Sequence, residues 1–205
     1  MIAIFLLTVV LTFSAGASAQ GAAALDDIER EVIGAAIAQT LHPNSSGWIL
    51  VDAQTAIFPC ASAPRNIINF GNCSGMKPPD KSVDEVLTGI QNSMAGVDEE
   101  TVTDLRNKSD NSVTLNRPFS LFVKQIFWRP GTPFATLADG SKPEFAVVVS
   151  RPGFDKNQGK ALVYIGAVRW SEPELSFGDY IFLIKEDSAW TVKHSLRAWQ
   201  LQKKE

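Results

Sequence analysis

Apolar side chains recur every three to four residues in three segments of the N-terminal half, a spacing typical of helices that bury one face. The first segment begins at Asp26, whose spacing to Glu29 is that of a capping box, and it ends at His42 because a proline follows. Ser82 and Asp98 have N-cap chemistry ahead of the other two segments. The pattern therefore predicts N-terminal helices.

From Val113 onward the apolar residues form runs that are rich in β-branched and aromatic side chains, as strands are. Short turns of Pro, Gly, Asn, Asp and Ser join four of these runs, and short connections favour antiparallel neighbours. The strands predicted for this meander cover 145–150, 160–168, 179–185 and 189–199. Residues 48–51 predict a short buried strand, and residues 119–128 fit a strand or a helix.

The first three strands of the meander are apolar on both faces, so both faces need cover. The last strand, 189–199, alternates between apolar and polar positions and should have one wet face. These patterns predict an α+β fold, in which N-terminal helices pack on one face of a C-terminal antiparallel meander of about four to five strands.

The first residues have the composition of an export signal. Residues 1–24 carry no charged side chain, an aliphatic and aromatic run covers 2–13, and Ala17-Ser18-Ala19 has the small residues that a signal peptidase recognises. We expect a signal peptide over 1–19 and a single globular domain over 20–205, periplasmic or extracellular, with no stable membrane span after cleavage. The alternative is an uncleaved N-terminal anchor.

Charge and cysteine content narrow the classes of partner. A formal net charge of -3 provides no basic surface for nucleic acid. Cys60 and Cys73, the two cysteines of the chain, predict a disulfide in an oxidising compartment. No spacing of Cys and His indicates a metal site, and no glycine-rich phosphate-binding motif indicates a nucleotide cofactor, so we expect neither.

His194 is the candidate for chemistry. Alternation along 189–199 places it on the inner face with Trp190 and Leu196. It would then be either a neutral core histidine or a general base in a cavity between sheet and helices. A carboxylate partner would have to come from a set of acidic residues that are equally consistent with a solvated surface, namely Glu144, Asp155, Glu172, Glu174 and Asp179.

Two pairs of arginine and tryptophan are candidates for binding. Trp170 follows Arg169, and Trp199 lies two residues after Arg197, on the same face of the predicted strand. Arginine and indole groups on a wet face can form a recognition platform by stacking. The alternative is that these tryptophans cover the sheet edge.

The C-terminal third resembles a set of exported, uncharacterised bacterial proteins with the signature SRxGFN…ALVY…GxYxxLxK…WxV. The matching residues are Ser150 to Asp155, Ala161 to Gly166, Gly178 to Lys185 and Trp190 to Val192, and Trp48 to Thr55 looks like an upstream strand of that set. Pro152, Asp155 and a missing cysteine pair depart from the signature. The resemblance implies export and a mixed α/β core, with Gly153 in a turn and Phe154 in the core, but no catalytic residues.

Three functions are consistent with these observations. The preferred one is a non-enzymatic exported protein that binds a ligand or an envelope protein, because the strong patterns explain folding and not chemistry. The second is a hydrolase that uses His194 with a carboxylate. The third is a small-molecule carrier of cystatin-like or nuclear-transport-factor-like shape, with His194 facing the cavity.

Overall fold

The computed structural model describes residues 25–43, 47–56, 83–129, 140–169 and 171–200. In these residues the chain forms the helices α1 (Asp27–Leu41), α2 (Val83–Ser93) and α3 (Glu99–Ser109). The strands are β1 (Trp48–Asp52), β2 (Lys124–Trp128), β3 (Phe145–Val149), β4 (Gly153–Phe154), β5 (Lys160–Arg169), β6 (Phe177–Glu186) and β7 (Ala189–Gln200). No helix among the described residues is long and apolar enough to cross a membrane.

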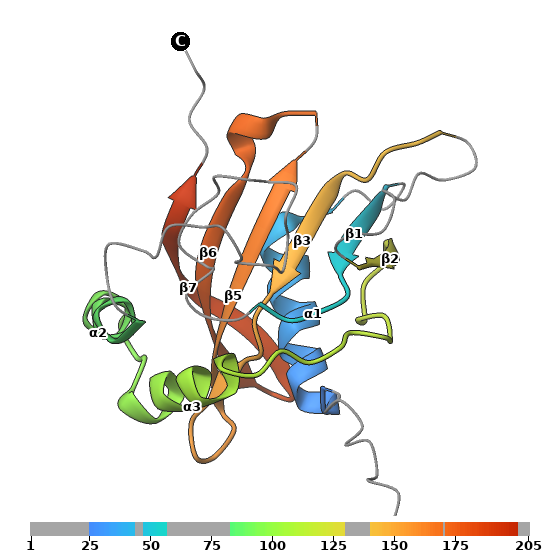
Figure 1. Ribbon diagram of the computed structural model, residues 1–205. Coiled ribbons are helices and arrows are strands. Elements are labelled where there is room, and N and C mark those ends of the chain that lie inside the picture. The colour runs from blue at the N-terminus through green and yellow to red at the C-terminus, as the bar shows by residue number, and fades with distance from the viewer. Residues whose placement is uncertain (1–24, 44–46, 57–82, 130–139, 170, 201–205) are drawn as a thin grey trace, which may run out of the picture.

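The described strands form one mixed sheet in the order β2-β1-β3-β5-β6-β7, and β4 pairs with β5 (Figure 1). The run from β3 through β5 and β6 to β7 is antiparallel, which confirms the predicted α+β class and the four strands of the meander. The sheet is larger than the predicted four to five strands, because β1 pairs in parallel with both β2 and β3. The long stretches of chain after β1 permit these parallel pairings, which a tight turn cannot make.

α1 covers one face of the sheet and begins as predicted. The Asp26 carboxylate accepts a hydrogen bond from the Glu29 amide at 2.7 Å, and the Glu29 carboxylate accepts one from the Asp26 amide at 3.2 Å. The helix ends at His42, which adopts a left-handed φ of 44°. Ile33 and Ile37 of α1 are fully buried in a core with alternate residues of the sheet.

α2 and α3 pack on the opposite face, so the prediction that the helices share one face is wrong. Ile90 of α2 and Leu105 of α3 are buried in a second core. The sheet contributes Leu162, Tyr164 and Phe182 to this core, and these residues alternate along the strands with the residues under α1. Figure 1 shows α1 behind the strands and α3 in front of their lower end. Strands that are apolar on both faces thus receive a helix on each.

A register shift in the pairing of β6 with β7 overturns the predicted orientation of His194. Leu183 pairs with Val192 and Phe182 pairs with His194, so one residue of β7 between them has no partner. Such a bulge moves the residues that follow it to the other face of the sheet. His194 therefore does not share the inner face with Trp190, and its side chain is exposed.

Gly153 allows the helix α3 to contact the sheet, and it does not serve a turn as the resemblance implied. A Cβ atom on Gly153 would lie 2.3 Å from the Leu105 nitrogen and 2.4 Å from the Thr101 oxygen, both backbone atoms of α3. Neither atom can move without displacing the helix. Phe154, the next residue, is buried in the core as expected.

Replacing Gly153 with alanine should therefore lower the free energy of unfolding by about 1–3 kcal/mol, the usual cost of overpacking. Urea denaturation of the wild type and the variant measures this change. Gly159→Ala is the matched control, because a Cβ atom there meets nothing within 4 Å. Equal stability of the two variants would contradict the close approach of α3 to β4.

Candidate functional site

The structure places His194 on the open surface of β7. Its ring stacks on the ring of Phe182, with centroids 6.4 Å apart and an interplanar angle of 11°. Within the described part of the chain, no carboxylate forms a hydrogen bond or ion pair with His194. The arrangement that a histidine-dependent hydrolase needs is therefore not formed by these residues.

Arg197 and Trp199 do not form the predicted platform, because a second register shift separates them. Arg197 pairs with the buried Asp179 and lies over the Phe177 ring, with its guanidinium carbon 4.6 Å from the centroid. Burial raises the pKa of Asp179, and the Arg197 guanidinium opposes this shift. Trp199 lies on the other face and donates a hydrogen bond to the Tyr164 hydroxyl at 2.8 Å. Trp170 lies outside the described residues.

The acidic candidates do not form a pair. Glu144 and Glu172 both lie near the Arg169 guanidinium, at 3.9 Å and 2.9 Å, and such ion pairs have a structural role. Glu174 lies in a short 3-10 turn before β6. Asp155 is the exception, because it lines a pocket. Cys60 and Cys73 lie outside the described residues, so their disulfide stays a prediction.

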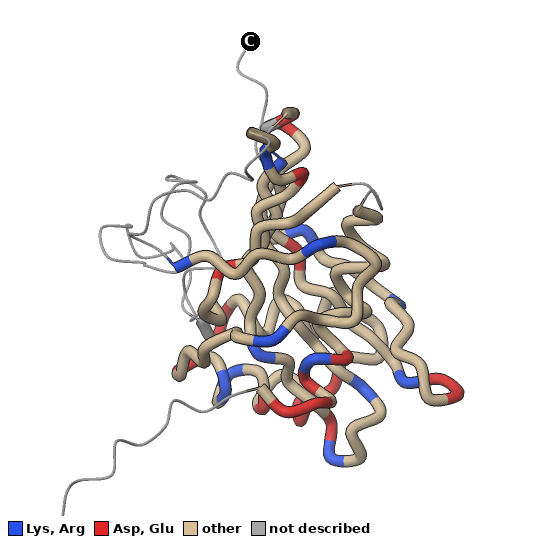
Figure 2. The backbone as a smooth tube through the Cα atoms, turned by 90° about the vertical axis from the view of Figure 1, so that its right-hand side faces the viewer, with Lys and Arg blue, Asp and Glu red and all other residues tan. Residues whose placement is uncertain are grey.

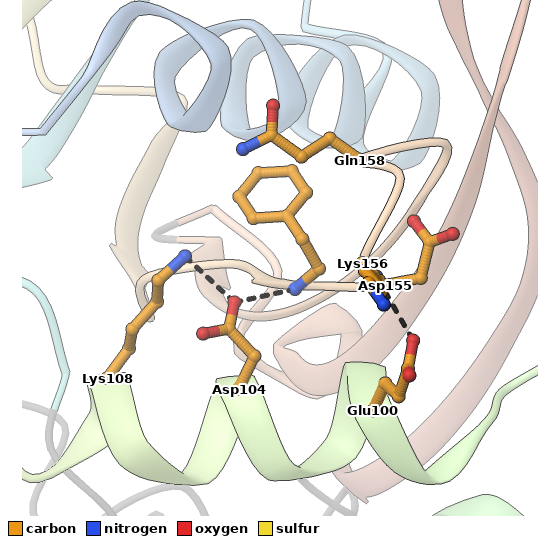
Figure 3. A pocket seen from close by; sticks show the side chains of 7 residues that line it. Glu100, Asp104, Lys108, Asp155, Lys156 and Gln158 are labelled. Carbon is orange, nitrogen blue, oxygen red and sulfur yellow. Dashed lines mark hydrogen bonds and ion pairs between the residues drawn. The ribbon is translucent and has the colours of Figure 1, made fainter.

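The pocket lies between α3 and the segment that follows β4, and we call it the α3 pocket (Figure 3). Its volume is about 340 Å³, and it is a shallow hollow that opens widely to solvent. One wall comes from α3, and the other comes from the residues that lead from β4 into β5. Its lining residues are Glu100, Asp104, Lys108, Phe154, Asp155, Lys156 and Gln158.

Hydrogen bonds from both walls hold the α3 pocket in shape. The Asp104 carboxylate accepts from the Phe154 amide at 2.8 Å, and the Glu100 carboxylate accepts from the Lys156 amide at 3.2 Å. Asp155 accepts from the amides of Gly159 and Lys160, each at 2.7 Å, and so closes the turn that enters β5. The chain around the pocket is preorganised, because both helix and turn side chains fix its backbone amides.

A buried charge network lies behind the pocket. The Glu29 side chain is fully buried, and its Oε1 accepts hydrogen bonds from the Arg151 Nη2 at 2.8 Å and Nε at 3.1 Å. The Lys108 Nζ lies 3.5 Å from the same oxygen and 2.9 Å from Asp104 Oδ2. Glu29 thereby links α1 to α3 and to the connection between β3 and β4.

Sequence reasoning included Asp155 among its candidates and missed the rest of the pocket. Glu100, Asp104 and Lys108 follow one another at intervals of four residues, which places them on one face of α3. This signal was available, but a charged helix face is most often solvated. Only the folded chain shows that the segment after β4 lies against this face (Figure 3).

A second unusual carboxylate lies at the end of β1. Asp52 is 3% exposed, and its Oδ1 accepts from the Gln54 amide at 2.9 Å, whereas its Oδ2 is buried without a hydrogen-bond partner. Burial raises the pKa of Asp52 to about 6, although the Gln54 hydrogen bond lowers it. Asp52 pairs across the sheet with Trp128 on β2.

Charged residues of both signs lie at the end of the molecule that carries α3, with acidic and basic positions close to one another (Figure 2). Among the described residues, no group of three or more His, Cys, Asp or Glu side chains could hold a metal ion. The candidate site in this part of the chain is a charged pocket.

Comparison with known proteins finds no matching family model, no matching curated protein and no matching solved structure.

Proposed function

We propose that this chain is a non-enzymatic protein, exported to the periplasm or the extracellular space, that binds a small ligand in the α3 pocket. The single observation that supports the proposal is the pocket itself, with a volume of about 340 Å³ and walls fixed by hydrogen bonds. A flat aromatic surface would instead favour a protein partner. Export rests on the apolar, uncharged start of the chain.

The chemistry of the pocket supports binding more than catalysis. Each of its three carboxylates accepts a hydrogen bond from a backbone amide, which fixes its position, and the described lining includes no His, Ser, Thr or Cys side chain. His194 lies on β7 and does not line the pocket. The carrier hypothesis with His194 in its cavity is therefore less well supported than a binding protein that uses α3.

A variant that blocks the pocket tests the proposal. Lys156 is exposed at the pocket wall, so Lys156→Trp should cover the opening with an indole ring. We expect at least one class of a panel of small amines, carboxylates, amino acids and sugars to shift the backbone amide signals of 156–159 in NMR titrations. The Trp variant should bind the same compound about tenfold or more weakly than Lys156→Gln, which removes the same charge without adding a ring, a difference of about 1.4 kcal/mol.

Lys142→Trp is the matched control, because Lys142 is also exposed but does not line the pocket. It lies before the start of β3, whereas the pocket residues of this part of the chain come after the end of β3. It should bind like the wild type. The proposal is wrong if no compound of the panel shifts the amides of 156–159, or if binding is unchanged in Lys156→Trp.

A further inference from the structure

The charges of the α3 pocket indicate what kind of ligand it accepts. Three carboxylates, of Glu100, Asp104 and Asp155, stand against two ammonium groups, of Lys108 and Lys156, so the lining carries one net negative charge. The sign of this net charge does not by itself determine which ligand binds, because salt and water screen exposed charges. What matters is which of the charged groups still have atoms free to contact a ligand.

Lys108 is held by contacts within the protein. An ammonium group has three N–H donors. The Lys108 Nζ has three oxygen neighbours, which are Asp104 Oδ2 at 2.9 Å, the Pro152 carbonyl at 3.2 Å and Glu29 Oε1 at 3.5 Å. An anion that approached Lys108 would compete with these contacts, one of which is to a fully buried acid.

The carboxylates, in contrast, keep free acceptors. The hydrogen bonds that hold the pocket use Oε2 of Glu100, Oδ2 of Asp104 and Oδ1 of Asp155. Within the described part of the chain, the other oxygen of each carboxylate has no hydrogen bond. A carboxylate oxygen accepts from ammonium or guanidinium donors, and these charge-assisted bonds are stronger than neutral ones.

The aromatic ring in the pocket also suits a cation. The Lys108 Nζ lies 4.5 Å from the centroid of the Phe154 ring, which is a cation–π geometry. The pocket thus already holds one ammonium group between an aromatic ring and carboxylates.

We infer that the α3 pocket accepts a small organic cation, a primary ammonium or guanidinium compound, through the free carboxylate oxygens of Glu100, Asp104 and Asp155. This inference rests on the proposed function, because it names the ligand class of the same pocket. Lys156 is the one lining cation that makes no ion pair among the described residues, and its charge opposes such a ligand.

Titrations with four probes of equal chain length test the inference, namely n-butylammonium, n-butylguanidinium, n-butyrate and n-butanol at low salt. We expect the two cations to shift the amide signals of 156–159 and the other two probes to leave them unchanged. Glu100→Gln keeps the acceptor for the Lys156 amide and should weaken cation binding about three- to fivefold, whereas Lys156→Gln should strengthen it by a similar factor. Glu99→Gln is the control, because Glu99 is exposed next to Glu100 and does not line the pocket.

Three results overturn the inference, and they differ in whether the proposed function fails with it. If butyrate binds better than butylammonium and Lys156→Gln weakens binding, the pocket is an anion site, and the ligand class is wrong although the binding function stands. If all four probes and the broader panel leave the amides of 156–159 unchanged, both fail. If Glu99→Gln and Glu100→Gln weaken cation binding equally, the preference for cations follows from the net charge alone, and this result also contradicts the inference.

Discussion

Replacing Glu29 with alanine should lower the free energy of unfolding by about 3–5 kcal/mol, because it leaves the partly buried Arg151 guanidinium without its counter-charge. The Glu29 carboxylate is fully buried and accepts two hydrogen bonds from Arg151. It also lies 3.5 Å from the Lys108 ammonium and completes the capping box with Asp26. Removal of the side chain breaks all of these contacts at once.

Chemical denaturation measures the loss, and two further variants define its cause. Glu31→Ala is the control on the same helix, because Glu31 is exposed and its only described ion pair, with Lys185, spans 3.9 Å; its cost should stay below about 1 kcal/mol. The double variant Glu29→Met with Arg151→Met removes both buried charges and should recover much of the stability. A loss below about 1 kcal/mol for Glu29→Ala would show that the network is not a structural element.

The wild type should lose stability between pH 4.5 and pH 8 because of Asp52, and Asp52→Asn should remove this loss. Burial raises the pKa of Asp52 to about 6 in the folded protein, above its ordinary value of 3.8. A carboxyl group whose folded pKa is raised stabilises the fold at low pH, and this contribution disappears as the pH rises through about 6. The expected difference between the two pH values is about 2 kcal/mol.

The measurement is urea denaturation of the wild type and Asp52→Asn at both pH values. The comparison uses the change, between the two pH values, in the difference in free energy of unfolding between the two proteins. The cost of burying the Asn amide is the same at both pH values, so it cancels. Asp27→Asn, at an exposed position of α1, controls for the loss of one negative charge. A pH-dependent difference below about 0.5 kcal/mol would show that Asp52 is ionised in the fold at no cost.

The amino-acid sequence by itself determined the elements whose causes are local. The capping box of Asp26 and Glu29 and the N-cap at Asp98 form as predicted, because the amides that they bind lie three residues away in the chain. The turns before β5 and β7 are short, so the antiparallel order of the meander follows from the lengths of its connections. The α+β class was predictable for the same reason.

Tertiary structure alone decided the features that depend on distant residues. Glu29 and Arg151 meet across 122 positions of the chain, so the capping box gave no sign of a second role for Glu29. The bulges in β7 depend on how β6 and β7 align, and the first of them placed His194 on the other face against the simple alternation of side chains. The α3 pocket exists because Gly153 lets α3 approach the sheet, a close contact between backbones that a periodic pattern of side chains does not encode.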